Sequence, residues 1–169
     1  RKTLSFYILG ILLCNLMIPT INNEDYAYFK NFLLESDIIF LKDKLEKVPW
    51  RQVQYYKPKR GQILTPRETW VSGGYQKIIN PHPKWAIPLL DYMNVTFKEN
   101  FNYILYSKYS SPSHSISPHS DDEFFLGSKP KIAILNVAES VSFILTNRIT
   151  KRKQTFHFQN NDLILMKND

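Results

Sequence analysis

The sequence predicts an α+β domain whose second half is a sheet sandwich or a jelly roll. Apolar residues recur at helical spacing in two segments of the first half, near residues 36–48 and 87–97. After Asn100 the pattern changes to strict alternation, and short strand-like segments continue to Met166 with polar turns between them. Helices followed by a run of short strands indicate segregated α and β structure rather than a parallel α/β sheet.

The first half of the predicted domain begins at Asp25 and contains two helices. Ser36 can cap the first helix, whose apolar residues fall at spacings of three, four and three. These apolar residues are Ile38, Leu41, Leu45 and Val48. The second helix has Pro88 near its start, a favoured position for proline. Its inward-facing residues are expected to be Ile87, Leu90, Met93 and Phe97.

The segments between the two helices predict strands and turns. Trp50–Tyr56 alternates loosely and is expected to be a strand, and Lys57–Pro66 is expected to be a basic, hairpin-like loop that contains Gly61. Trp70–Tyr75, with its two glycines, predicts a strand end and a turn. Pro81-His82-Pro83 predicts a loop, because proline interrupts both helices and strands.

The second half of the domain is predicted to be strands. Residues 101–109 alternate, with Tyr103, Leu105 and Tyr109 among the residues of one face and Tyr106 on the other. Further strands are expected at Lys131–Val137, Ser140–Leu145, Gln154–Phe158 and Asp162–Met166. The domain is therefore assigned to residues 25–169, and it is expected to be incomplete at its C-terminus.

Composition and charge are compatible with a polyanionic partner. The net charge is +7, and the basic residues gather in two clusters rather than one run. One cluster is Lys57, Lys59, Arg60 and Arg67, and the other is Arg148, Lys151, Arg152 and Lys153. Solvated turn charges explain such clusters equally well. A single cysteine excludes an internal disulfide and fits a reducing compartment.

Residues 1–24 form an apolar leader of open status. The stretch is short for a membrane span, which needs about 20 apolar residues, but it suits a signal-peptide core. A non-native leader and a buried helix are the alternatives. We expect a nuclear or cytoplasmic protein without stable membrane association, and secretion only if residues 1–20 are a genuine signal peptide.

The segment His119-Ser120-Asp121-Asp122-Glu123 is the strongest candidate for chemistry. In an extended segment, His119 and Asp121 point to the same side. With a third ligand from elsewhere they would complete the 2-His-1-carboxylate triad of non-haem Fe(II) oxygenases. The alternative is a surface turn in which Asp121 caps a backbone group.

The residues around this segment resemble those of the AlkB family of Fe(II)- and 2-oxoglutarate-dependent dioxygenases. The resemblance covers residues 25–169, and the eukaryotic, fungal-type nucleic-acid demethylases are the nearest branch. The matching residues are Tyr28-Phe29, Phe32-Leu33, Thr65-Pro66-Arg67, residues 101–105, Tyr109, residues 115–118, His119–Glu123, Leu126-Gly127 and Pro130. The resemblance implies a double-stranded β-helix (jelly-roll) core with N-terminal helices packed on it. It also implies oxidative demethylation of N-alkylated bases in nucleic acid, as in DNA repair, with release of formaldehyde.

The resemblance also implies a role for each matching side chain. His119 and Asp121 would be catalytic iron ligands, and Tyr109 would hydrogen-bond the co-substrate 2-oxoglutarate. Four residues would contact the methylated base: Arg67 and Trp70 in a recognition lid, and Asp122 and Glu123 beside the base. Stacking of Trp70 on a flipped base would contribute about 1–3 kcal/mol. The two basic clusters would bind phosphates without sequence preference.

Several positions depart from the family pattern. Ser107 replaces an expected asparagine, and Ser72 replaces an aromatic residue near the lid. The second iron histidine and the arginines for 2-oxoglutarate are expected after residue 169. His157 is expected on an exposed strand face, His114 in an exposed turn and His82 in a loop. None of the three is therefore expected to replace the second iron histidine.

Two alternatives to a demethylase remain. One is an inactive AlkB-like remnant with a basic nucleic-acid-binding surface. The other is a jelly-roll oxygenase that acts on a protein or a lipid. No obligate protein partner is inferred.

Overall fold

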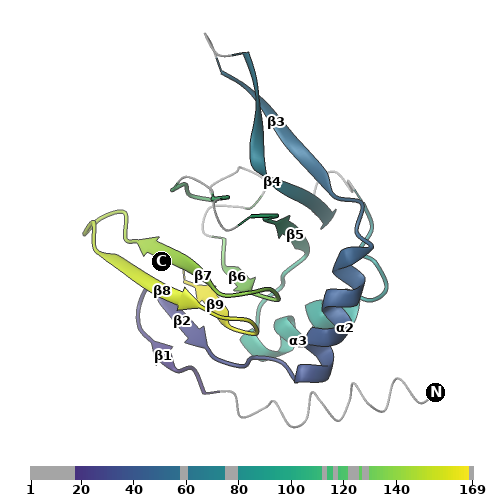
Figure 1. Ribbon diagram of the computed structural model, residues 1–169. Helices are drawn as coiled ribbons and strands as arrows, with labels where there is room; N and C mark the ends of the chain where they lie inside the picture. The colour runs from purple at the N-terminus through teal and green to yellow at the C-terminus, as the bar shows by residue number, and fades with distance from the viewer. Residues whose placement is uncertain are drawn as a thin grey trace, which may run out of the picture. The chain divides into compact units, whose positions relative to one another are not determined.

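The computed structural model describes residues 18–57, 61–74, 80–111, 114–115, 118–121, 126 and 130–167, with backbone alone at 53, 55–57 and 63–66. This part of the chain contains helices and mostly antiparallel strands, which confirms the α+β class (Figure 1). The double-stranded β-helix stays a prediction. The chain divides into two compact units. The first unit consists of Arg1–Glu46 and Asp121–Asp169, and the second unit consists of Lys47–Ser120.

Most of the apolar leader, residues 1–17, lies outside the described residues. In the part of the chain that the structure describes, no helix combines the length and the apolarity needed to cross a bilayer.

The first unit contains a four-stranded sheet with the order β1-β2-β9-β6. Its strands are β1 (Ile21–Asn22), β2 (Tyr26–Phe29), β9 (Leu163–Met166) and β6 (Ile132–Leu135). Each pairing in it is antiparallel. β6 and β9 lie where strands were predicted. β2 was not predicted, because its four residues are all buried and therefore show no alternation.

A two-stranded sheet of β7 (Val141–Thr146) and β8 (Lys153–Phe158) belongs to the same unit. Both strands were predicted. His157 lies exposed between two buried phenylalanines, as its place in the alternating pattern requires. Its exposure confirms the expected strand face.

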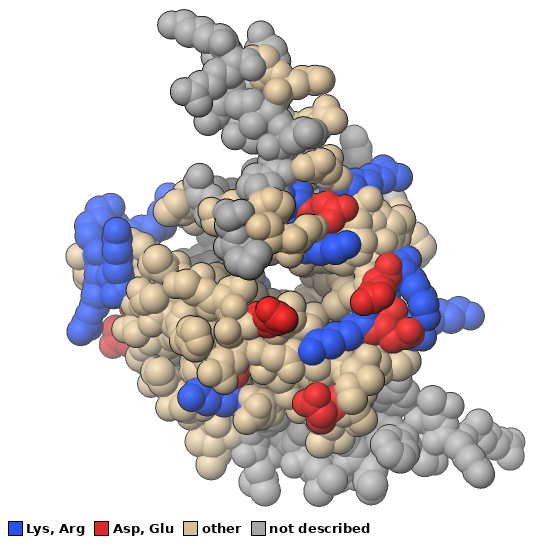
Figure 2. Space-filling view, in the orientation of Figure 1, with Lys and Arg blue, Asp and Glu red and all other residues tan. Residues whose placement is uncertain are grey.

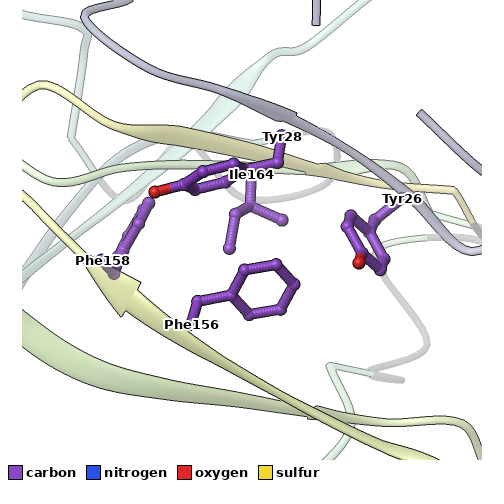
Figure 3. Packing of buried hydrophobic residues seen from close by; sticks show 5 residues of the cluster. All are labelled: Tyr26, Tyr28, Phe156, Phe158 and Ile164. Carbon is purple, nitrogen blue, oxygen red and sulfur yellow. The ribbon is translucent and has the colours of Figure 1, made fainter. Parts of the chain in front are cut away.

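The core of this unit is aromatic (Figure 3). Tyr26, Tyr28, Phe156, Phe158 and Ile164 form its buried cluster. The ring of Tyr26 meets that of Phe156 edge to face with centroids 5.0 Å apart, a favoured aromatic geometry. Burial of each large side chain contributes about 1.5–3 kcal/mol. The cluster therefore joins β2 and β9 to the β7–β8 hairpin.

A buried carboxylate lies at one edge of this core. Asp162, 2% exposed, accepts a hydrogen bond from the hydroxyl of Tyr28 and a 2.8 Å bond from the backbone N–H of Gln159. Burial, this hydrogen bond and the charge of Asp162 all raise the pKa of Tyr28. The phenol therefore stays protonated and remains a donor to the carboxylate.

Helix α2 (Glu35–Glu46) also belongs to the first unit. The carbonyl of Leu34 accepts the bonds from Asp37 and Ile38 that open the helix. Ser36 therefore lies inside the first turn, and its predicted capping role is wrong. Two acidic residues in that turn, Glu35 and Asp37, favour the positive end of the helix dipole instead.

The second unit contains a three-stranded antiparallel sheet with the order β3-β4-β5. Its strands are β3 (Arg51–Lys57), β4 (Gly61–Gly73) and β5 (Tyr103–Lys108). The prediction of a loop over Lys57–Pro66 is wrong, because β4 begins at Gly61. Gln54 pairs with Leu64 and Gln52 with Glu68, so an irregularity in this register contains Pro66. A residue without an N–H is tolerated at such a bulge.

Helix α3 (Ile87–Phe97) lies in the second unit, with a proline in its first positions as predicted. The predicted inward face is partly wrong. Tyr92 is the buried residue of the helix, and Ile87 is 42% exposed. Lys98 ends the helix in the left-handed conformation.

Candidate functional site

The two candidate iron ligands lie outside regular secondary structure. His119 is exposed and Asp121 is half-buried. An imidazole and a carboxylate match the ligand types of an Fe(II) triad, so they fit two of its three protein positions. Among residues with described placement, no group of three or more His, Cys, Asp and Glu side chains could hold a metal ion. A third ligand is therefore not found in this part of the chain.

Of the other predicted site residues, the structure describes Tyr109 but not Asp122 or Glu123. Tyr109 follows β5 directly and is 39% exposed. Asp122 and Glu123 lie outside the described residues, as do the cations at positions 59 and 60.

Arg67 lies beside the bulge of β4 and lines a cavity of about 240 Å³. The other lining residues are Gln52, Glu68, Ser110 and His114. The expected exposure of His114 is wrong: it is half-buried, and its Nδ1 has no hydrogen-bond partner among the described residues.

Glu68 supplies the negative charge of this cavity. Its carboxylate lies 3.6 Å from Lys108 Nζ and accepts a 3.2 Å hydrogen bond from Ser110 Oγ. The carboxylate is therefore partly compensated. Together with Arg67 and His114, the cavity offers both donors and acceptors, which suits a polar ligand better than an apolar one.

Trp70 stands directly opposite Tyr106 in the β4–β5 register. Their ring centroids are 5.0 Å apart with an interplanar angle of 33°, and Trp85 contacts Tyr106 at 5.8 Å and 62°. Trp70 is half-buried, whereas Tyr106 is 8% exposed. Part of Trp70 is therefore accessible while one side contacts a fixed ring.

A hydrogen-bonded group that the sequence did not reveal lies next to this pair. Ser72, fully buried, is 3.2 Å from the hydroxyl of Tyr106 and 2.9 Å from Nδ1 of His82. The expectation of a plain loop at His82 missed this contact. In the sequence, the signal for this hydrogen-bonded group was Ser72, a short polar residue where the family pattern has an aromatic residue.

The basic cluster at the end of the β7–β8 hairpin is described in full. Arg148, Lys151, Arg152 and Lys153 are all exposed. Asn147 shapes the turn, because its Oδ1 accepts bonds of 2.9 Å from the N–H groups of Ile149 and Thr150. Figure 2 shows Lys and Arg side chains gathered over this end of the hairpin, at the left edge of the view. We call these four residues the basic hairpin end.

The described features define an α+β protein with antiparallel sheets, a candidate pair of iron ligands and a three-stranded sheet that carries Arg67 and Trp70. No protein-family profile matches the chain. The chain is 33% identical over 142 residues to the mouse (Mus musculus) protein named "Alpha-ketoglutarate-dependent dioxygenase alkB homolog 3". The match covers 77% of this chain and 46% of that protein, so the chain spans about half the length of the curated relative. The similarity supports an AlkB-like family and suggests the 2-oxoglutarate-dependent dioxygenase class.

Proposed function

We propose that this protein is an AlkB-type Fe(II)- and 2-oxoglutarate-dependent dioxygenase that demethylates N-alkylated bases in nucleic acid. One observation carries the proposal. The segment His119–Glu123 has the spacing of the iron-binding turn, within a chain 33% identical to a protein named as an AlkB homolog. Chance occurrence of a His-x-Asp triplet does not account for both.

The side chains would divide the work by their chemistry. The imidazole of His119 and the carboxylate of Asp121 would hold Fe(II), which supplies oxidation of the N-methyl group when bound with 2-oxoglutarate. Tyr109, an exposed residue after β5, would donate a hydrogen bond from its hydroxyl to 2-oxoglutarate. Asp122 and Glu123 would favour a cationic methylated base.

The base itself would be received on the β4–β5 sheet. The accessible part of Trp70 offers a surface on which an extruded base can stack. Arg67 lines a polar cavity of about 240 Å³ in the same unit, large enough for a polar group of a nucleotide. These two residues would therefore select a flipped nucleotide.

The basic hairpin end supports nucleic acid as the partner. Its four exposed cations lie in a stretch, Val141–Phe158, without any Asp or Glu. Exposed cations on an ordered turn bind phosphates and release counterions, which gives salt-dependent affinity. With a nucleic-acid substrate, we expect the protein in the nucleus or the cytoplasm.

The test is demethylation by the protein expressed from its complete open reading frame. An oligonucleotide with an N-methylated adenine or cytosine is incubated with Fe(II), 2-oxoglutarate and air, and formaldehyde and the repaired base are measured. We expect turnover by the wild type and by His157→Ala, and loss of turnover in His119→Ala and Asp121→Ala. Equal turnover in all four proteins would contradict the proposal.

A second candidate is a nucleic-acid-binding protein without turnover, and the four exposed cations of the basic hairpin end favour it over a protein or lipid oxygenase. It predicts that the oligonucleotide binds but no formaldehyde appears. An oxygenase with a protein or lipid substrate would instead show no effect of Arg67, Trp70 or the basic hairpin end on nucleic-acid binding.

A further inference from the structure

The aromatic pair of the β4–β5 sheet is held by a chain of hydrogen bonds whose direction can be assigned. The Nε2 atom of His82 lies 3.2 Å from the backbone oxygen of Asn102. A carbonyl oxygen can only accept, so Nε2 carries the proton and donates. In the neutral ring, Nδ1 is then the acceptor, and the Ser72 hydroxyl, 2.9 Å away, donates to it.

The direction of the hydrogen bond between Ser72 and Tyr106 follows from the protons available to each group. The single proton of Ser72 is directed at His82, so Ser72 Oγ accepts from the hydroxyl of Tyr106 at 3.2 Å. Burial raises the pKa of Tyr106 by more than the hydrogen bond with Ser72 lowers it. Its hydroxyl therefore keeps its proton and remains a donor. The chain runs from Tyr106 through Ser72 and His82 to the backbone at Asn102, and each donor in it has one acceptor.

Backbone contacts fix the His82 end of this chain. Gly73 N–H donates to the carbonyl of Asn80 at 2.8 Å, and Gly74 N–H donates to that of Asn102 at 3.0 Å. Gly73 has φ +78, and the His82 ring and the Asn102 carbonyl occupy the space that a Cβ would need. The segment before α3 is therefore fastened directly onto the end of β4, and the position of His82 is set by backbone contacts.

We propose that Tyr106, Ser72 and His82 are positioning residues for Trp70. Tyr106 is the surface against which the Trp70 ring lies, and the hydrogen-bond chain prevents the phenol ring from shifting. The 33° tilt between the two rings sets the orientation that Trp70 presents to a planar ligand. This inference rests on the proposed role of Trp70 in stacking on a nucleobase, and none of the three residues needs to touch that base.

The first experiment measures the fluorine NMR resonance of the Trp70 ring and needs no ligand. The protein is labelled with 5-fluorotryptophan, and the Trp70 resonance is assigned by comparison with Trp70→Phe. We expect Ser72→Ala to shift or broaden the Trp70 resonance, and Tyr106→Phe to do the same because it removes only the hydroxyl. Ser36→Ala, an exposed serine on α2, is the matched control and should leave that resonance unchanged. An unchanged Trp70 resonance in both network variants would overturn the inference.

The second experiment uses a double-mutant cycle on binding of a methylated single-stranded oligonucleotide, measured by fluorescence anisotropy without iron. Trp70→Ala should weaken binding about 5- to 150-fold, the range for one base–aromatic stack. Ser72→Ala should weaken it about 3- to 10-fold, but should have no further effect in the Trp70→Ala background. The same loss in both backgrounds would show that Ser72 acts independently of Trp70, which contradicts the positioning role.

The two experiments separate this inference from the proposed function. If Ser72→Ala moves the Trp70 resonance but Trp70→Ala leaves binding unchanged, the ring is positioned as inferred and the stacking role in the proposed function is wrong. Unfolding in urea, measured for each variant, separates a local change at Trp70 from a general loss of stability.

Discussion

Replacement of Tyr28 by phenylalanine tests the buried carboxylate of the first unit. Asp162 accepts two hydrogen bonds on one oxygen, from Tyr28 and from Gln159, and is 2% exposed. Tyr28→Phe keeps the ring, whose centroid lies 5.4 Å from that of Phe156, and removes only the donor. Loss of a hydrogen bond to a charged group costs about 1.5–3 kcal/mol. For an m-value of about 2 kcal/mol/M, the urea midpoint should fall by about 1 M.

Tyr26 provides the matched control on the same strand. It is 6% exposed, and its hydroxyl makes no hydrogen bond within the described residues. Tyr26→Phe removes the same atom from the same core and should change the free energy of unfolding by less than about 0.5 kcal/mol. Equal urea midpoints for the two variants would refute the reasoning, because they would show that the bond to Asp162 contributes nothing beyond ring burial.

Three further predictions concern pH, a glycine and charge. Above about pH 10 the free energy of unfolding should fall more steeply in the wild type than in Tyr28→Phe, by about 1.4 kcal/mol per pH unit. Because the pKa of Tyr28 is raised in the folded protein, the phenol ionises first in the unfolded chain. The contribution of Tyr28 to the free energy of unfolding is therefore present below the pKa of a free tyrosine and is lost above it. Urea titrations across this pH range measure the loss. Gly73→Ala should cost more than about 1 kcal/mol in thermal unfolding, and more than Gly61→Ala, which shares the positive φ but meets no neighbour. The double substitution Lys151→Glu with Arg152→Glu should reduce the slope of log affinity against log salt by about 1.4 for single strands. The control double substitution, Lys42→Glu with Lys84→Glu, also changes exposed lysines and should leave the slope unchanged. Equal slopes for the two double variants would contradict phosphate binding by the hairpin.

Alternation in the sequence was sufficient to predict most of the strands. β5 to β9 each lie within or beside a predicted segment, and in β7 and β8 burial alternates between the two faces of the strand. The same rule missed β2, which is buried on both faces, and it misplaced the start of β4. Gly61 and Pro66 are strong breakers on average, but a register irregularity accommodates the proline within the strand.

The candidate site was predictable where it depends on a local motif and unpredictable where it depends on distant contacts. His119 and Asp121 are recognisable from their spacing alone. The contact between Ser72 and Tyr106 joins residues 34 positions apart, and that between Ser72 and His82 depends on a loop folding back onto β4. No periodicity encodes such contacts. The cavity beside Arg67 has the same origin, since its lining comes from β3, β4 and the segment after β5.

Anaerobic equilibrium dialysis with Fe(II), with and without 2-oxoglutarate, is the most direct test of the proposed oxygenase site. For the protein expressed from its complete open reading frame, we expect iron retention that increases when 2-oxoglutarate is present. His119→Ala and Asp121→Ala should abolish that increase, and His157→Ala, an exposed histidine outside the site, should preserve it. Retention that is the same in all four proteins, or that does not respond to 2-oxoglutarate in the wild type, would contradict an iron site at His119 and Asp121.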